Sequence, residues 1–439
     1  MTHVEGAEAV DGPADGSATA AEAGPDRPLR HNRDFLLLWS GASLSFLAAR
    51  VTAVAYPLIV LWHTGSPLAM SVVSTAALLP LLLVQLPAGA LVDRWNRRRL
   101  MLVCEAGRLV AVGSVALALA AGRMTVAHLA ACAFVEASLA VFYRLAERGA
   151  VRNIVHPAHL PTALAQNEAR GRAAGLLGQP GGVLLQSAAR WLPFGFGALG
   201  YLASALSLLL IRKDFQQERA DRTGRHRMAT EVAEGMRWLW RQRFLRAALG
   251  YVAGTNVLFQ MLALALILRI KEAGLPSATL AVVLGIGGVG GLCGALAGGR
   301  IQRRMRQRTL LVGGAVAWAL LIGAMGLTSE PVALGMLYAG TGFVGAVFNV
   351  GASVYQVRTT PDALQGRVAA TAGLIGSGTN ALGSLAAGLL LAAWGAETTV
   401  RSIAAAMAVL ALLAVLAPDL KGEITDDRTD KGTGSITGG

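Results

Sequence analysis

Residues 89–99 read Gly-Ala-Leu-Val-Asp-Arg-Trp-Asn-Arg-Arg-Arg, an apolar segment that turns abruptly into a basic one. The apolar run begins near Leu68 and ends at Val92, and its one strongly polar side chain is Gln85. A helix needs about 20 such residues to cross a hydrocarbon layer of about 30 Å. The stretch therefore marks the end of a membrane-spanning helix and the charged loop that follows it.

The composition is that of a membrane protein, because 54% of the residues are hydrophobic and only 15% are charged. A soluble all-helical protein, the alternative, needs more charge to cover its surface. Backbone groups that face lipid must be satisfied internally, which leaves a helix bundle or a closed barrel. Barrel strands alternate polar and apolar residues, whereas these segments are continuous runs of Leu, Ala, Val and Gly. We therefore predict an all-α polytopic membrane protein.

The apolar runs and the residues that interrupt them predict twelve transmembrane helices as two six-helix bundles. The spans lie near residues 35–62, 68–92, 99–121, 124–146, 164–189, 191–211, 244–268, 276–299, 309–328, 331–356, 366–392 and 396–417. The expected regions are a disordered tail, a first bundle, a linker, a second bundle and a second disordered tail, over residues 1–32, 33–211, 212–243, 244–417 and 418–439. Within the linker, residues 231–243 predict an amphipathic interfacial helix, with Trp238 and Trp240 at headgroup depth.

Arginine placement predicts the orientation. Alternate connections are rich in arginine, at Arg94, Arg97, Arg98 and Arg99, at Arg144, Arg148 and Arg152, and at Arg300, Arg303, Arg304, Arg306 and Arg308. Such connections stay on the cytoplasmic side, so both termini are expected there as well. The formal net charge of +13 is then a signal of topology and does not indicate a nucleic-acid partner. The acidic first 30 residues lack the basic start and apolar run of a secretory signal.

The two halves are alike. Gly89-Ala90-Leu91 precedes a basic cluster at the end of span two, and Gly294-Ala295-Leu296 does so at the end of span eight. Parallel repeats are how many transporters build two bundles that move about a central site. Chance similarity between helices rich in Ala, Gly and Leu is the alternative.

Residues 89–99 resemble motif A of the major facilitator superfamily, through Gly89, Asp93, Arg94, Arg97 and Arg98. An ordinary positive-inside loop would explain the arginines but not the glycine four residues before an aspartate. One departure is Asn96, where the family usually has glycine. The resemblance implies the major facilitator fold over about residues 33–417.

The same resemblance implies a cytoplasmic latch. An aspartate at the membrane edge can meet the N-terminus of another helix, whose exposed N–H groups favour an anion. For Asp93, the implied partner is span eleven, which begins near Gly366 and is flanked by Asp362 and Arg367. Gly89 would let the helices approach closely.

Span five contains a glycine- and proline-rich stretch that looks like motif C of exporters in the superfamily. Its matching residues are Gly175, Gly178, Pro180, Gly181 and Gly182, and Gln179 departs from the usual glycine. Plain helix packing is the alternative to a hinge that favours export.

Residues 164–167, 234–240 and 361–368 resemble the macrolide-efflux and enterobactin-exporter branch. That branch implies proton-coupled efflux of a small amphipathic molecule (a drug, an antibiotic or a siderophore-like metabolite) by a monomer in the lipid bilayer. No phosphate-binding loop of the G-x-x-x-x-G-K-[ST] type occurs in the sequence, so neither an enzyme nor a nucleotide cofactor is expected. His156 and His159 are interpreted as loop residues, and no metal site is predicted.

Ionisable side chains within spans are costly and usually functional. Arg50 and Glu136 lie about halfway along spans one and four, which line the central cavity in this fold, so we expect them to pair. A structural ion pair without a role in transport is the alternative. Asn256, Gln260 and Asn349 are expected to complete a polar cavity. Glu105 and Arg108 lie nearer the cytoplasmic edge, and we assign them to the charge network of motif A.

Two functional alternatives stay open beside export: an importer or lipid-moving member of the fold, and a membrane sensor that has lost transport. Motif C favours export, and charges inside the spans argue against an inert sensor. The Ala, Gly and Arg bias indicates a high-GC bacterial genome, so the expected location is a bacterial cell membrane.

Overall fold

The computed structural model describes residues 29–92, 94–211, 215, 237, 243–305, 307–359 and 365–416. In these ranges the regular structure is helical, and no strand occurs among them. The helices are η1 (Leu29–His31), α1 (Arg33–Thr64), α2 (Pro67–Leu83), α3 (Gln85–Val92), α4 (Arg97–Ala120), α5 (Val126–Ile154), η2 (Pro157–His159), α6 (Leu160–Ala188), α7 (Leu192–Leu210), α9 (Arg243–Glu272), α10 (Ala278–Arg304), α11 (Gln307–Met325), α12 (Pro331–Thr359) and α13 (Gln365–Leu416).

These helices account for the twelve predicted spans. Span two is divided at Val84 into α2 and α3, and Pro80 removes one backbone donor just before the break. Spans eleven and twelve both belong to α13, which turns at Gly395 (φ 72°, ψ 179°). Glycine adopts such a positive φ at little cost, so the chain can reverse there without a longer loop.

Eight of the described helices are long and apolar enough to cross a membrane, and α2 and α11 are shorter apolar helices. Among the described helices, α6 is not one of the eight, although it spans 29 residues. Glu168, Arg170 and Arg172 interrupt its first half: Glu168 and Arg172 form an exposed pair, and Arg170 joins a buried network described below. Exposed leucines such as Leu117, Leu199 and Leu320 form the lipid-facing surface of the other helices.

Local sequence fixes where several helices begin. Ser66, Asn96 and Thr125 each accept a hydrogen bond from a backbone N–H one turn into α2, α4 and α5. The Asn96 side chain accepts from the backbone N–H of Arg99 at 3.1 Å. Asparagine at this position, the departure from motif A, therefore starts the helix that carries the rest of the motif.

Several helices continue beyond their predicted boundaries. Span four extends to Ile154, so Arg144, Arg148 and Arg152 lie on α5 and not in a loop. Spans seven, eight and ten extend to Glu272, Arg304 and Thr359. Span five begins at Leu160, because the η2 turn leads directly into α6. The interfacial helix expected over 231–243, with Trp238 and Trp240, lies outside the described residues except at Arg237 and Arg243.

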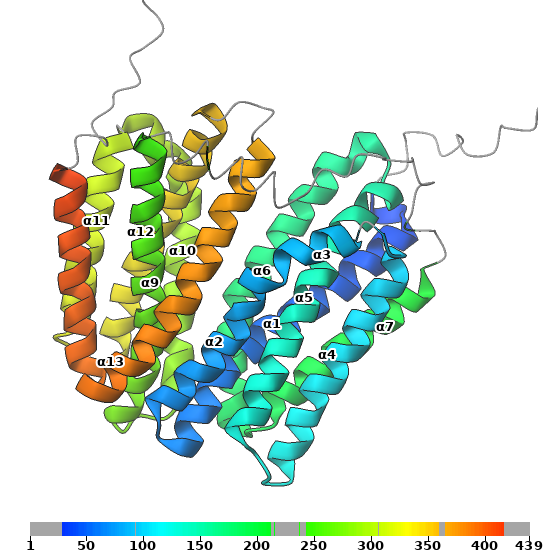
Figure 1. Ribbon diagram of the computed structural model, residues 1–439, viewed down its shortest axis with the longest axis horizontal. Coiled ribbons are helices and arrows are strands. Elements are labelled where there is room, and N and C mark those ends of the chain that lie inside the picture. The colour runs from blue at the N-terminus through cyan, green and yellow to red at the C-terminus, as the bar shows by residue number, and fades with distance from the viewer. Residues whose placement is uncertain are drawn as a thin grey trace, which may run out of the picture.

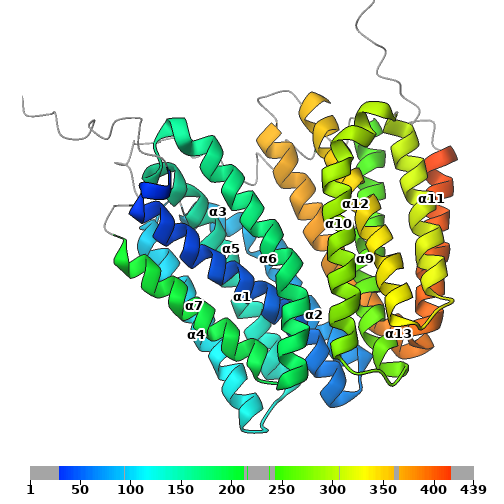
Figure 2. The same ribbon diagram turned by 180° about the vertical axis from the view of Figure 1, so that it is seen from behind.

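The spans form two bundles, one of α1–α7 and one of α9–α13 (Figures 1 and 2). The ribbons approach each other where α1 and α9 end and diverge where these helices begin. Close packing between the bundles comes from α2 against α13 and from α6 against α10. Ser384 on α13 donates to the backbone carbonyl of Ser71 on α2 at 3.3 Å, and Gly288 on α10 meets Leu176 on α6. One hydrophobic core, which includes Leu61 and Leu262, runs across this junction.

Candidate functional site

The carboxylate of Glu136 lies at the centre of the first bundle and is 5% exposed. Three hydroxyl groups from two other helices surround it. Thr52 and Tyr56 on α1 lie 2.7 Å from Oε1 and 2.8 Å from Oε2, and Tyr201 on α7 donates to Oε1. A buried carboxylate needs such donors, because an unsatisfied charge in a medium of low dielectric is costly. Glu136 therefore ties α1, α5 and α7 together.

Tyr201 connects this carboxylate to a second ionic group. The guanidinium carbon of Arg108, on α4, lies 3.9 Å from the centre of the Tyr201 ring, within the range of a cation–π contact. Arg108 also lies 3.6 Å from Glu105, one turn earlier on the same helix. Both side chains are buried. A contiguous polar chain thus runs from Glu136 through Tyr201 and Arg108 to Glu105.

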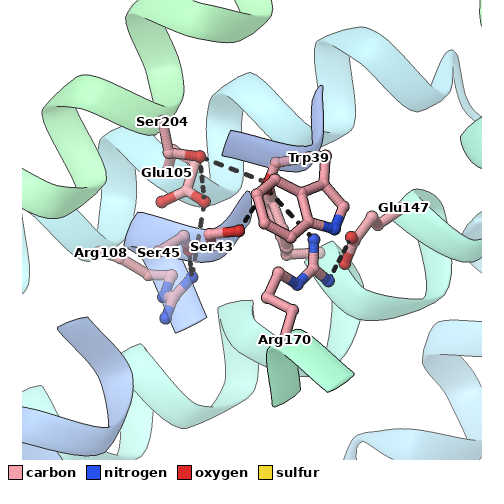
Figure 3. A network of polar contacts seen from close by, with 9 residues as sticks. Trp39, Ser43, Ser45, Glu105, Arg108, Glu147, Arg170 and Ser204 are labelled. Carbon is pink, nitrogen blue, oxygen red and sulfur yellow. Dashed lines mark hydrogen bonds and ion pairs between the residues drawn. The ribbon is translucent and has the colours of Figure 1, made fainter. Parts of the chain in front are cut away.

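Serines from two helices complete the Arg108–Glu105 pair (Figure 3). Arg108 Nη1 donates to Ser45 Oγ on α1 at 2.8 Å, and Ser204 Oγ on α7 donates to Glu105 Oε1 at 3.0 Å. The second carboxylate oxygen of Glu105 and the Nε of Arg108 have no partner in the described part of the chain. The pair is therefore incompletely satisfied, which is typical of a polar network that can rearrange.

A second buried ion pair lies beside the first, as Figure 3 shows. Arg170 on α6 and Glu147 on α5 are 2.7 Å apart, with each side chain 7% exposed. Arg170 also reaches the backbone carbonyl of Trp39 on α1 at 3.5 Å. Removing one partner of such a pair leaves an uncompensated buried charge, which makes the pair a strong constraint on how α1, α5 and α6 meet.

A cavity of about 250 Å³ opens beside Glu136. Side chains from α1, α2, α4 and α5 line it. Its charged lining consists of Arg50, Arg108, Glu136 and Arg144, and its aromatic lining of Phe46, Tyr56 and Tyr143. An apolar cavity with a few convergent polar groups is the usual form of a small-molecule site.

The expected Arg50–Glu136 pair is wrong. Both side chains line the cavity, but no ion pair joins them in the described part of the chain, because three hydroxyl groups already satisfy Glu136. The guanidinium carbon of Arg50 lies instead 5.7 Å from the centre of the Phe46 ring. Arg50 is an exposed side chain of the cavity lining, whereas Glu136 lines the cavity with only 5% of its surface exposed.

The assignment of Glu105 and Arg108 to the motif A network is also wrong. Their contacts are with Ser45, Ser204 and Tyr201 inside the bundle, and Arg108 lines the cavity. Depth along α4 predicted the edge of the membrane, whereas both side chains contact α1 and α7 inside the bundle.

The three amides of the second bundle do not line this cavity. Asn256 and Gln260, on α9, are half-buried and face α13: a Cβ atom added at Gly376 would lie 3.4 Å from Asn256 Nδ2, and one at Gly383 3.1 Å from Gln260 Cβ. Asn349 is exposed on α12. The prediction that Asn256, Gln260 and Asn349 complete the cavity is therefore wrong. The two bundles diverge, and Asn256 and Gln260 on α9 face α13 instead.

The arginines of motif A bind the end of α7. Arg98 Nε and Nη2 donate to the carbonyls of Leu208 and Leu209 at 3.2 and 2.9 Å, and Arg97 Nη1 reaches the carbonyl of Phe215 at 3.4 Å. The last carbonyls of a helix lack intrahelical partners and carry partial negative charge, so cations stabilise them. Gly89 is half-buried in α3 and Arg94 is exposed.

The latch partners lie largely outside the described residues. Asp93 and Asp362 are among the residues that the structure does not describe, as are the side chains at Gly366 and Arg367. α13 begins at Gln365, next to the predicted Gly366.

Two of the motif C glycines face α1 directly. A Cβ atom at Gly182 would lie 2.6 Å from the Val51 carbonyl oxygen, and one at Gly178 would overlap Arg50 Cβ. Gly175 and Gly181 have nothing within 4 Å of such an atom, and Pro180 Cγ lies 4.0 Å from one at Gly285 on α10. The motif thus places α6 between α1 of its own bundle and α10 of the other.

The sequence analysis did not predict the hydroxyl groups that bind Glu136, those of Thr52, Tyr56 and Tyr201. Thr52 and Tyr56 are four residues apart on one helix, a spacing that puts both on one face. That spacing was a usable signal, whereas nothing local connects either residue to Tyr201 in span six.

Two bundles of six spans, joined through α2 with α13 and α6 with α10, define the class of major facilitator transporters. The chain belongs to the family described as transmembrane secretion effector, whose sequence model matches residues 23–430. It is a transporter and not an enzyme, and it is a multi-pass protein of the cell membrane.

Named relatives are consistent with this membership. The multidrug efflux pump Tap of Mycolicibacterium fortuitum is 27% identical over 387 residues, which cover 84% of this chain and 92% of Tap. Tap of Mycobacterium tuberculosis is 26% identical over 396 residues, covering 84% and 90%. The uncharacterized transporter YfiS of Bacillus subtilis is 26% identical over 341 residues, covering 75% and 78%.

Solved structures share the fold at low identity. The nucleoside transporter NupG has a TM-score of 0.68 and 13% identity, covering 87% of this chain and 98% of its own. A bacterial homologue of the lysosomal transporter Spinster, in an inward-facing conformation, has a TM-score of 0.70 and 14% identity, covering 88% and 97%.

Proposed function

We propose that this protein exports a small amphipathic molecule from the cytoplasm by proton-coupled alternating access, with Glu136 as the proton-binding group. The relatives named as multidrug efflux pumps support the direction of transport. The observation that carries the proton assignment is the carboxylate of Glu136, held by three hydroxyl groups at the wall of the cavity.

The chemistry of this arrangement favours coupling. An ionised carboxylate only accepts hydrogen bonds, so Thr52, Tyr56 and Tyr201 can all donate to it. A protonated carboxyl group must itself donate, so at least one hydroxyl has to turn and accept. Protonation therefore weakens a connection between α1, α5 and α7, and the packing of the bundle becomes sensitive to the proton. A ligand with different affinities for the two arrangements shifts their populations.

Tyr201 extends that sensitivity to Arg108. The guanidinium rests on the face of the Tyr201 ring and borders the same cavity, so a shift of the tyrosine displaces it from Glu105 or from Ser45. Arginine keeps its own proton, which leaves Glu136 and Glu105 as the groups that can exchange one. Glu136 is preferred because it lines the cavity directly.

The test is the pH profile of efflux in proteoliposomes that contain Glu136→Gln protein. Glutamine keeps the size of the side chain and resembles the protonated carboxyl group, because one end accepts hydrogen bonds and the other donates them. It cannot exchange a proton, so the rate should become independent of pH. Glu168→Gln is the matched control, because Glu168 is a 70% exposed carboxylate paired with Arg172 on α6. A Glu136→Gln profile that matches the wild-type profile would assign coupling elsewhere, with Glu105 next.

A further inference from the structure

We propose that the cavity beside Glu136 binds an anionic amphipathic substrate: an apolar or aromatic body that carries a carboxylate, phosphate or sulfonate group. The inference rests on the proposed transport function and adds the chemical class of the substrate.

The ionisable lining of the cavity is mostly cationic. Arg50, Arg108 and Arg144 line it, and Glu136 is its one carboxylate among the described residues. The Glu105 carboxylate behind Arg108 offsets one of the guanidinium charges. An excess of positive charge is left even with both carboxylates ionised, and it favours the entry of anions into a site with walls of low dielectric.

Two of the three guanidinium groups are available to a ligand. In the described part of the chain, neither Arg50 nor Arg144 forms a hydrogen bond or an ion pair with another residue, and Arg50 is exposed. A guanidinium presents its N–H donors in a planar fork that matches a carboxylate or phosphate. Keeping two such forks without partners beside a cavity is costly unless an anion occupies them for part of the cycle.

Glu136 is a poor counterion for a cationic substrate. Its Oε1 accepts from Thr52 and Tyr201, its Oε2 accepts from Tyr56, and the side chain is 5% exposed. A cationic ligand would have to displace these donors and then remain close to three arginines.

The remaining lining suits an apolar body. Phe46, Tyr56, Ala77 and Leu81 present aromatic and aliphatic surface to the cavity. The guanidinium of Arg50 lies 5.7 Å from the Phe46 ring centre, so an anion bound to Arg50 would lie next to an aromatic wall. An amphipathic anion therefore satisfies the arginines with one end and the apolar wall with the other.

The test compares two fluorescent dyes that share the same ring system but carry opposite charges. Carboxyfluorescein is the anion and tetramethylrosamine is the cation. Binding to the purified full chain is measured by fluorescence polarisation. Carboxyfluorescein should bind more tightly, and Arg50→Gln and Arg144→Gln should each weaken its binding about tenfold by removing charge-assisted hydrogen bonds. Arg152→Gln is the matched control, because it removes the same charge from an exposed position on the same helix.

Two results would overturn the inference: tighter binding of tetramethylrosamine, or carboxyfluorescein affinity that is equal in wild-type and both variant proteins. If Arg50→Gln fails to fold, Arg144→Gln and direct competition between the dyes on wild-type protein decide the outcome. Efflux of both dyes from the same vesicles separates this inference from the proposed function. Export of the cation alone contradicts the anionic class and leaves export standing, whereas anion binding without efflux of either dye contradicts export and supports the anionic class.

Discussion

Lys271, at the end of α9, donates from its Nζ to the backbone carbonyl of Leu61, in the last turn of α1, at 2.5 Å. This contact joins the two bundles where they lie closest (Figure 1). The carbonyls of the last turn of a helix carry partial negative charge, so the ammonium group stabilises the end of α1 as well as the junction. The adjacent Glu272 accepts from the backbone N–H of Ala396 at 3.2 Å, which fixes the turn of α13 beside it.

Lys271→Met should shift the protein towards the conformation in which these helix ends are apart. A hydrogen bond from a charged donor contributes about 1.5–3 kcal/mol, so the ratio of the two populations should change by a factor of about 10 to 100. The measurement is the distance distribution between spin labels at Arg123 and Leu327, which are exposed at this end in different bundles. Lys271→Arg keeps a cationic donor and should preserve the wild-type distribution. Equal distributions in Lys271→Met and wild type would rule out a gating role.

Arg98→Gln should lower the thermal stability of the first bundle. The change removes two hydrogen bonds to the last carbonyls of α7 and the charge that complements the helix end. Because Arg98 is half-buried, we expect a loss of roughly 1 kcal/mol in the free energy of unfolding. Arg94→Gln, at an exposed position of the same motif, is the control and should unfold as wild type does. An unchanged melting temperature of Arg98→Gln in detergent would mean that water hydrogen-bonds to the α7 carbonyls in place of the guanidinium without a loss of stability.

Gly182→Ala should destabilise the contact between α1 and α6. The added methyl group would lie 2.6 Å from the Val51 carbonyl oxygen and 2.7 Å from Val54 Cγ1, which forces the helices apart. Overpacking of this kind costs about 1–3 kcal/mol. Gly181→Ala is the matched control one residue away, where the methyl group meets nothing within 4 Å. Thermal unfolding of both variants measures the difference, and equal melting temperatures would remove the packing role from Gly182.

Asp93→Asn should leave expression near the wild-type level and slow transport. The proposed contact between this carboxylate and the start of span eleven contributes roughly 0.3–2 kcal/mol and exists in one conformation only. Its loss should therefore favour the inward-open state. Accessibility of a cysteine placed at Ala140, on the cavity wall, reports that shift from the cytoplasmic side. Unchanged transport together with unchanged accessibility would argue against the latch.

Topology can be tested with single cysteines on a background in which Cys104, Cys132 and Cys293 are replaced. His63 and Met305 are both exposed, the first at the end of α1 and the second between α10 and α11. The arginine distribution predicts that a cysteine at His63 is labelled from outside intact cells and one at Met305 only after the membrane is opened. Labelling of Met305→Cys in intact cells would contradict the predicted orientation.

Much of the fold was readable from the sequence because partition into a membrane is a local property. Each span is recognised by a run of about 20 apolar residues, independently of the rest of the chain. The division of α13 was anticipated in the same way, because the predicted spans 366–392 and 396–417 leave a break at residues 393–395, where the chain turns at Gly395. Boundaries failed where a helix continues past its apolar stretch, as α5 does through Arg144 and Arg148 to Ile154.

The candidate site was only partly readable, because pairing depends on side chains from distant spans. The sequence identified Arg50 and Glu136 as costly charges near the middle of their spans, since each has mainly apolar neighbours, and it placed Glu105 and Arg108 nearer the cytoplasmic edge. Matched depth along two helices then predicted the wrong partner for Glu136. The depth of a residue along its helix does not show in which direction its side chain points. On α1, Thr52 and Tyr56 contact the Glu136 carboxylate, whereas Arg50 faces the cavity.

The sequence by itself therefore determined the class of the protein, the number of its spans and some of its intramembrane charges, among them Arg50 and Glu136, but not the buried pair of Glu147 and Arg170. Hydrophobicity and charge are properties of each residue, so these features can be predicted without knowing which residues are in contact in the folded protein. Tertiary structure alone decided that Tyr201 links Glu136 to Arg108, and that Arg50 and Arg144 line the cavity with no hydrogen bond or ion pair to another described residue. Those relationships join residues from separate helices, and the packing of α1, α4, α5 and α7 sets their distances.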